Sequence, residues 1–266
     1  MKSPSATSED AADRRQPNLG HPRLHLRRTD STNERARALA IAGAPHGTLV
    51  SAGEQTAGRG RQGRTWVAPA GSALLCSLVV RDPPPLLSLL AGVAVCDAVG
   101  EHSSRRNAQR ARRALVKWPN DVVFATDAGL QAERAPTLAK LAGILVEGRP
   151  QEGWAVVGIG VNVAVRTEEL PVEVRTGAAS LELAPSAIEP LLAELLIAFA
   201  RRLAQPADVL LEAWRARDAL CGREVTWTGG HGRAEGIDHD GRLLVCGPDG
   251  TTTALSAGEV HFESVG

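Results

Sequence analysis

The chain has 266 residues, and its 30 acidic side chains balance 30 lysines and arginines, which makes the formal net charge +0 at pH 7. This length supports one large hydrophobic core with room for a small second domain. A neutral chain has no overall field that attracts nucleic acid or membranes, so any electrostatic function must be local. No apolar run approaches the ~20 residues of a membrane-spanning helix, and the N-terminus lacks the apolar core of a signal peptide. We therefore expect a cytoplasmic protein without a membrane partner.

The four cysteines point to the same compartment. Cys76, Cys96, Cys221 and Cys246 show no CxxC spacing, and three of them lie in apolar runs. Reduced, buried thiols are favoured over a disulfide or a zinc site, which stay open as alternatives.

The first part of the chain predicts strands and helices behind a polar tail. Residues 1–20 carry Ser, Asp, Arg and Pro without periodicity, which is typical of a disordered segment. Ser31 is followed three residues later by Glu34, the pattern of a capping box, and Gly43 follows the Ala- and Leu-rich run of that helix. Strands are expected at residues 24–26, 48–52 and 72–81, with an apolar helix at 86–99.

The middle of the chain also predicts strands and helices. Apolar runs flank a turn at residues 117–121, and runs at 140–147 and 154–165 predict an antiparallel pair of strands. Residues 125–136 are a polar excursion. The basic segment 101–113 fits a solvated face or loop, with a nucleic-acid patch as the alternative. Helices are expected at 188–203 and 207–220.

The C-terminal part differs in character. Short β-type segments at residues 224–227, 232–237, 243–245 and 251–255 are separated by Gly-Gly and Asp-Gly turns. This spacing predicts a small β-barrel of about 45 residues. The predicted fold class is α/β (α+β), with a mixed β-sheet domain flanked by helices at residues 21–220 and the barrel at 221–266.

Residues Gly58–Arg64, here named the arginine loop, place three arginines among three glycines. Guanidinium groups suit phosphate and carboxylate oxygens, and glycines let the backbone approach such a ligand closely. The GxGxxG match is not a dinucleotide fingerprint, because Trp66 to Pro69 follow where a helix is required. An RNA-binding Arg/Gly segment stays an alternative, although such segments are normally repetitive and lie in tails.

Three other positions have both a functional and a purely structural interpretation. Ser31 and Thr32 lie at a helix N-terminus, which can bind polar ligand groups or simply be capped. Lys117–Asp121 is either a site or an ordinary turn. Lys140 begins a buried strand, where it needs an anionic partner or a path to solvent.

The order and spacing of five segments resemble the biotin protein ligase family. These segments are Ser31–Asn33, Glu54–Trp66, Lys117–Asp121, Lys140–Glu147 and Gly158–Asn162. The resemblance covers about Leu24 to Phe262 and implies that the C-terminal barrel is SH3-like. The arginine loop and the Lys-Trp-Pro-Asn-Asp motif are highly specific.

The resemblance implies an ATP-dependent ligase. Biotin and ATP would form biotinyl-5′-AMP and diphosphate with Mg²⁺ on the phosphates, and the adenylate would then modify one lysine of a biotin carboxyl carrier protein or domain. The family pattern implies three sets of site residues in this chain. The catalytic set is Lys140, Arg59 and Arg61; the biotin-binding set is Ser31, Thr32, Asn33, Gln55, Arg59, Gly60, Arg61, Lys140 and Gly143; the ATP- and adenylate-binding set is Arg61, Arg64, Trp66, Lys117, Asn120, Asp121, Lys140 and Asn162.

Only about 30 residues precede Ser31, fewer than a winged helix and linker need, so we expect a monofunctional ligase, monomeric or homodimeric, without a DNA partner. Two rival functions remain. One is a lipoate or octanoate transferase-like protein, whose glycine-rich motif is absent here, and the other is a nucleic-acid-binding module with strongly salt-dependent affinity. The link between Asp121 and Lys140 is longer than in compact members of the family. Metal ligands, the acceptor subunit and the roles of segments 101–113 and 125–139 are not predicted.

Overall fold

The structure is a computed structural model that describes residues 19–107, 112–126, 137–256 and 261–262. The predicted tail up to residue 18 and most of the polar excursion after residue 126 lie outside the described residues. Leu19 and Gly20 were assigned to the tail but belong to the fold, because Leu19 is buried and the Gly20 amide donates to the Gly47 carbonyl at 2.8 Å. Within the described part, no helix is long and apolar enough to cross a membrane.

The main domain is built on a seven-stranded mixed sheet with the order β1-β2-β3-β7-β6-β5-β4. β1 pairs with β2 in parallel, and every other neighbouring pair in this sheet is antiparallel. The strands are β1 (Arg23–Leu26), β2 (Leu49–Ala52), β3 (Ala73–Arg81), β4 (Ala114–Lys117), β5 (Asp121–Thr126), β6 (Thr137–Arg149) and β7 (Trp154–Asn162). This confirms the predicted mixed sheet and the antiparallel pairing of β6 with β7.

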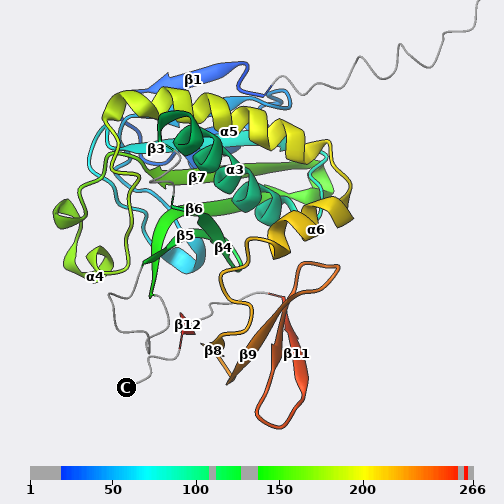
Figure 1. Cartoon of the computed structure of the whole chain (residues 1–266). Helices are drawn as coiled ribbons and strands as arrows, with labels where there is room; N and C mark the ends of the chain where they lie inside the picture. The colour runs from blue at the N-terminus through cyan, green and yellow to red at the C-terminus, as the bar shows by residue number, and fades with distance from the viewer. Residues whose placement is uncertain (1–18, 108–111, 127–136, 257–260, 263–266) are drawn as a thin grey trace, which may run out of the picture.

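Helices cover both faces of the sheet, and Figure 1 shows α3 and α5 in front of its strands. α3 (Leu87–Asn107) packs with α5 (Ile188–Leu203) on one face, and α2 (Thr32–Ile41) contacts β2, β3 and β7 on the other. Strand side chains alternate between faces, and Leu74, Cys76 and Leu78 of β3 therefore join the core below α3 and α5. The intervening Val79 packs with Ala36 of α2 instead.

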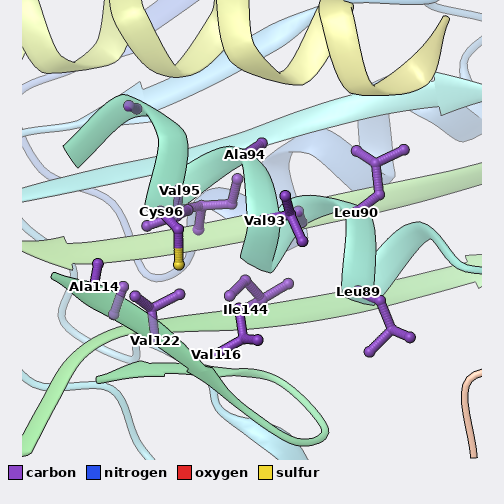
Figure 2. Close-up of a cluster of buried hydrophobic side chains, with 14 of the residues drawn as sticks. Leu89, Leu90, Val93, Ala94, Val95, Cys96, Ala114, Val116, Val122 and Ile144 are labelled. Atoms are coloured by element: carbon purple, nitrogen blue, oxygen red, sulfur yellow. The ribbon is translucent and has the colours of Figure 1, made fainter. Parts of the chain in front are cut away.

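The core under α3 is continuous. Figure 2 shows Leu90, Val93 and Cys96 of this helix above Val122 and Ile144 of the sheet. Burial raises the pKa of the Cys96 thiol to about 12, so the group is protonated at neutral pH. Cys76, Cys96, Cys221 and Cys246 are all free thiols, as predicted, but burial was predicted correctly only for Cys76 and Cys96, because Cys221 is exposed and Cys246 is half-buried.

A five-stranded antiparallel sheet forms the C-terminal domain, in the order β11-β10-β9-β8-β12. Its strands are β8 (Glu224–Trp227), β9 (Gly230–Ile237), β10 (Leu243–Cys246), β11 (Thr252–Leu255) and β12 (His261–Phe262). Gly229, Gly241 and Gly250 adopt positive φ in the turns, where a side chain would be strained. The small β domain predicted after the main domain is confirmed.

Three local predictions differ from the structure. The helix predicted at 86–99 continues to Asn107, so the first part of the basic segment is helical. α6 (Ala207–Arg215) ends before the predicted residue 220, and the next residues pair instead with β4 through the amide of Ala219 and the carbonyl of Val116 at 2.9 Å. The remaining helices are α4 (Val172–Arg175) and 3₁₀ turns at Arg61–Gly63, Pro150–Glu152, Thr167–Glu169 and Pro185–Ala187.

The third difference concerns the capping box. Ser31 occupies the N-cap of α2, but its side chain makes no capping hydrogen bond. Glu34 does not reach back to the cap either, because its carboxylate forms ion pairs with Arg37 and Arg59. Within the described residues, the Ser31 hydroxyl is therefore not engaged in capping the helix.

Candidate functional site

A cavity of about 390 Å³ lies on the α2 face of the sheet. It contains all but one of the site residues expected from the sequence. Those lining it are Ser31, Thr32, Asn33, Gln55, Arg59, Gly60, Arg61, Arg64, Trp66, Asn120, Asp121, Lys140, Gly143 and Asn162. Lys117 is not among the described residues that line the cavity.

Neutral polar groups form one part of the cavity wall. Ser31 and Thr32 begin α2 and are only 2% and 4% exposed. The Thr32 backbone amide donates to Gln55 Oε1 at 2.7 Å, which fixes the amide of Gln55 against the helix N-terminus. Hydroxyls and amides of this kind can bind the neutral polar edge of a ligand.

The arginine loop covers another side of the cavity and is folded on itself. The Gly60 amide donates to the Arg64 carbonyl at 2.7 Å, and Arg59 forms a β-bridge with Thr65. Gly58 is required for close packing, because a Cβ there would lie 2.4 Å from the Trp66 carbonyl oxygen. The Arg59 guanidinium pairs with Glu34 and lies 3.8 Å from a carboxylate oxygen of Glu147.

Trp66 lies against the sheet at positions where the strands carry glycine. A Cβ on Gly160 would lie 2.6 Å from the indole, and one on Gly143 would lie 3.1 Å from it. The indole also packs with Leu75 and Leu170. Its Nε1 atom is buried and has no hydrogen-bond acceptor within the described part of the chain. The two strand glycines thus create the space that the indole occupies.

The turn after β4 provides charged groups. The Asn120 side-chain amide donates to the Ile144 carbonyl at 3.0 Å, and the Ile144 amide donates to the Asn120 carbonyl at 2.9 Å. This clamp to β6 places Asp121 beside Lys140, with 2.8 Å between Oδ1 and Nζ. Lys117 lies opposite Asp121 in the β4–β5 register. Burial lowers its pKa, Asp121 opposes this shift, and the nearby cations Lys140 and Arg64 add to it.

Asn162 ends β7 at the cavity and is 4% exposed. Its amide donates to the Ala179 carbonyl at 2.9 Å, whereas its Oδ1 atom is buried and accepts no hydrogen bond from the described residues. A buried acceptor without a donor is costly unless a ligand or water satisfies it.

The sequence did not reveal the segment around α4. Leu170, Glu173, Val174 and Thr176 line the cavity, and the Lys140 amide donates to the Gly177 carbonyl at 2.6 Å. A four-residue helix leaves no periodic pattern in the sequence, and only its tertiary pairing with β6 shows its position. Cys76 also borders the cavity, but its side chain packs in the core below α3 and α5, and burial raises the pKa of its thiol to about 12, so it is protonated at neutral pH.

Comparison with known proteins agrees with this geometry. Residues 25–163 match the biotin/lipoate A/B protein ligase family, and residues 220–262 match the biotin protein ligase C-terminal domain. The chain is 37% identical over 263 residues to the biotin–[acetyl-CoA-carboxylase] ligase of Paracoccus denitrificans, covering 89% of this chain and 99% of that protein. It is 34% identical to the ligase of the same name from Mycobacterium tuberculosis, covering 87% and 85% of the two chains.

A solved structure shares the fold. The biotin protein ligase from Aquifex aeolicus in complex with biotin and ATP superposes with a TM-score of 0.71 at 25% identity, covering 91% of this chain and 98% of that chain. Together, the fold, the cavity and these matches define a member of the biotin/lipoate ligase class. The chain belongs to the biotin protein ligase family.

Proposed function

We propose that this protein activates biotin with ATP to biotinyl-5′-AMP and then transfers biotin to a lysine of a biotin carboxyl carrier protein or domain. The observation that carries the proposal is the composition of one cavity, which combines neutral hydrogen-bonding groups with Lys140 and the arginine loop. Biotin is itself divided in this way, because it has a neutral ureido ring at one end and a carboxylate at the other.

Each part of the cavity has a role in this proposal. Ser31, Thr32 and Gln55 bind the ureido ring. Gly143 lines the cavity, where the missing side chain leaves room for the Trp66 indole and the Lys140 side chain. Lys140, Arg59 and Arg61, together with the backbone of Gly60, face the carboxylate and the α-phosphate. The nucleotide is bound by Arg64, Trp66, Asn120, Asp121 and Asn162 of the cavity, and by Lys117, which lies opposite Asp121 in the β4–β5 register.

The chemistry requires cations at the reacting centre. The biotin carboxylate attacks the α-phosphorus, an oxygen–phosphorus bond forms, and diphosphate leaves. Like charges approach in this step, so Lys140 and the arginines lower its barrier by stabilising the developing negative charge. The cavity also shields the mixed anhydride from water until an uncharged lysine amine attacks the acyl carbon and AMP leaves.

Transfer of biotin depends on the state of the acceptor lysine and of the intermediate. The lysine amine must be uncharged to attack the acyl carbon. The intermediate must still be bound in the cavity when the acceptor arrives, because the adenylate is hydrolysed if it is released into water. The names of the relatives point to a carboxylase subunit as acceptor, and we propose a carrier domain of a biotin-dependent carboxylase. A ligase without repressor function, as a monomer or homodimer, stays a prediction.

Mg²⁺ fits the nucleotide side of the cavity. Mg²⁺ binds with nucleotides through phosphate oxygens and one or two carboxylates. The carboxylate of Asp121 lies in the cavity beside Lys140, so Asp121 would hold the ion together with the phosphates. When bound, Mg²⁺ neutralises charge on the leaving diphosphate. Among the described residues, the acidic and histidine side chains that cluster at metal-ligand distances are Asp238, His239 and Asp240, and none of them lines the cavity.

The test is a complete reaction with the purified protein, biotin, ATP, Mg²⁺ and a carrier domain. We expect one lysine of the carrier to gain the mass of a biotinyl group, with diphosphate released. Parallel reactions replace biotin with lipoate or use a carrier whose acceptor lysine is changed to arginine. Activation of lipoate in preference to biotin would contradict the proposal.

A further inference from the structure

Asn33 lies in the cavity wall, but its polar groups are already engaged by the protein. The residue is 4% exposed. Its Nδ2 atom donates to Glu147 Oε2 at 2.8 Å and to the Leu145 carbonyl at 3.3 Å. Its Oδ1 atom accepts from the Ser77 hydroxyl at 2.6 Å. Asn33 thus has no N–H group left to donate to a ligand.

The chemistry of its neighbours fixes the orientation of this amide. A carboxylate and a backbone carbonyl only accept hydrogen bonds, so the NH₂ group must face Glu147 and Leu145. The amide oxygen must then face Ser77. Since a hydroxyl has one proton, Ser77 donates that proton to Asn33 Oδ1.

The next contact in this series of hydrogen bonds decides whether the Thr32 hydroxyl donates to a ligand or accepts from it. The Ser77 and Thr32 hydroxyl oxygens are 2.9 Å apart, which is hydrogen-bond distance. With its proton committed to Asn33, Ser77 donates nothing to Thr32. Gln55 Oε1 only accepts hydrogen bonds, and it lies 2.7 Å from the Thr32 backbone nitrogen and 3.0 Å from the Thr32 hydroxyl oxygen. The single Thr32 hydroxyl proton therefore points to Gln55 Oε1 or to the Ser77 oxygen, and the hydroxyl has only lone pairs left for a ligand in the cavity that Thr32 lines.

Gly158 provides the space for this arrangement. A Cβ at this position of β7 would lie 2.1 Å from Asn33 Oδ1 and 2.8 Å from its Cγ. Both atoms belong to a buried side chain that three hydrogen bonds hold in place, so it cannot move aside at low cost. Gly158 is therefore needed for the hydrogen-bonded arrangement of Asn33.

We propose that Asn33 and Glu147 are positioning residues that orient the Ser77 and Thr32 hydroxyls, so that Thr32 presents an acceptor to an N–H group of the ligand. This inference rests on the proposed function, in which the ligand is the ureido ring of biotin, a group with two N–H donors. It removes Asn33 from the residues that bind biotin directly. Glu147 has a second role, because its other oxygen faces Arg59 at 3.8 Å and connects the hydroxyl network to the arginine loop.

The decisive experiment exchanges the two partners. Asn33→Asp places a second carboxylate against Glu147 and the Leu145 carbonyl, where only a donor is tolerated. We expect the Kd for biotin, measured by calorimetry, to rise about 10- to 100-fold, with a much smaller change in the KM for ATP. Asn33→Asp combined with Glu147→Gln restores a donor–acceptor pair in the reverse direction. We expect this double variant to recover at least tenfold of the lost biotin affinity.

Three single variants test the separate contacts of this network. Glu147→Gln alone keeps an oxygen that can accept from Asn33, so we expect its biotin affinity to stay within about threefold of the unmodified protein. Glu34→Gln removes the other carboxylate beside Arg59 without touching Asn33 and serves as the matched control for charge at the loop. Ser77→Ala removes the hydroxyl that lies between Asn33 and Thr32, and we expect it to weaken biotin binding. This variant tests the inference independently if Asn33→Asp does not fold.

The outcomes distinguish this inference from the proposed function. Wild-type biotin binding and adenylate formation are measured first, and their absence would overturn the function itself. With wild-type binding intact, the inference is overturned if the double variant binds biotin no better than Asn33→Asp. It is also overturned if the loss of ATP affinity matches the loss of biotin affinity, or if a folded Ser77→Ala variant binds biotin normally.

Discussion

The ammonium group of Lys140 lies 2.8 Å from the Oδ1 atom of Asp121. The Lys140 side chain is 37% exposed toward the cavity, so the pair is open to an incoming anion. A biotin carboxylate and a phosphate can therefore compete with Asp121 for the same cation. Because the charge between the two substrates develops only as they react, Lys140 acts most strongly in the transition state.

This relationship predicts how a Lys140 variant fails. Lys140→Ala should lower the rate of adenylate formation about 100- to 1000-fold and change the KM for ATP far less. Lys140→Arg keeps the positive charge and should retain part of the rate. Single-turnover measurement of biotinyl-AMP separates the chemical step from transfer. Equal losses in rate and in ATP binding would contradict this assignment.

The arginine loop predicts a defect in retention of the intermediate. Arg61 lines the cavity and begins the 3₁₀ turn of the loop, next to the residues whose backbone closes it. Arg61→Ala removes a guanidinium that can make charge-assisted bonds to the adenylate. The off-rate of biotinyl-AMP should rise roughly tenfold or more, as measured by chase of labelled intermediate. An unchanged off-rate would indicate that Arg59 or Arg64, and not Arg61, retains biotinyl-AMP.

Gly160 predicts a steric defect on the nucleotide side. The added Cβ of Gly160→Ala would lie 2.6 Å from the Trp66 indole, which must then move. We expect a rise of about tenfold in the KM for ATP and a stability loss of ~1–3 kcal/mol. Gly100→Ala in α3 is the control, because its Cβ would meet nothing within 4 Å and alanine favours a helix. Equal ATP kinetics in both variants would show that the position of Trp66 is unimportant.

Trp118 connects the site turn to the C-terminal domain. Its indole N–H donates to the Gly241 carbonyl at 3.0 Å, and the side chain is 3% exposed. Trp118→Phe leaves that carbonyl without its donor and should lower the free energy of unfolding by about 1–3 kcal/mol, measured by denaturant titration.

A second variant tests the same contact from the other domain. A Cβ on Gly241 would lie 2.7 Å from Leu89 and 2.8 Å from Leu86, at a positive φ that disfavours any side chain. Gly241→Ala should therefore destabilise the protein at least as much as Trp118→Phe. If both variants unfold like the unmodified protein, the two domains are not coupled through this contact.

Much of the fold follows from local patterns. Continuous apolar runs predicted β3 and β7 because both strands are buried on their two faces, and Asp-Gly and Gly-Gly turns predicted the C-terminal strands. The boundaries were less accurate. α3 extends through polar residues that show no stop signal, and the segment around α4 is too short for a periodic pattern.

The sequence by itself determined most of the residues that line the cavity, because their types and order resemble those of a known family. It could not show how those residues share protons and space. The paired Lys140 and the fully engaged Asn33 both depend on contacts between segments far apart in the chain. Glu147 and Gly158 lie more than 100 residues after Asn33, and only the pairing of β6 with β7 beneath α2 brings them together. The tertiary structure therefore decided which polar groups remain for a ligand, because a buried group that the protein already engages, such as the Asn33 amide, has no hydrogen bond left to offer.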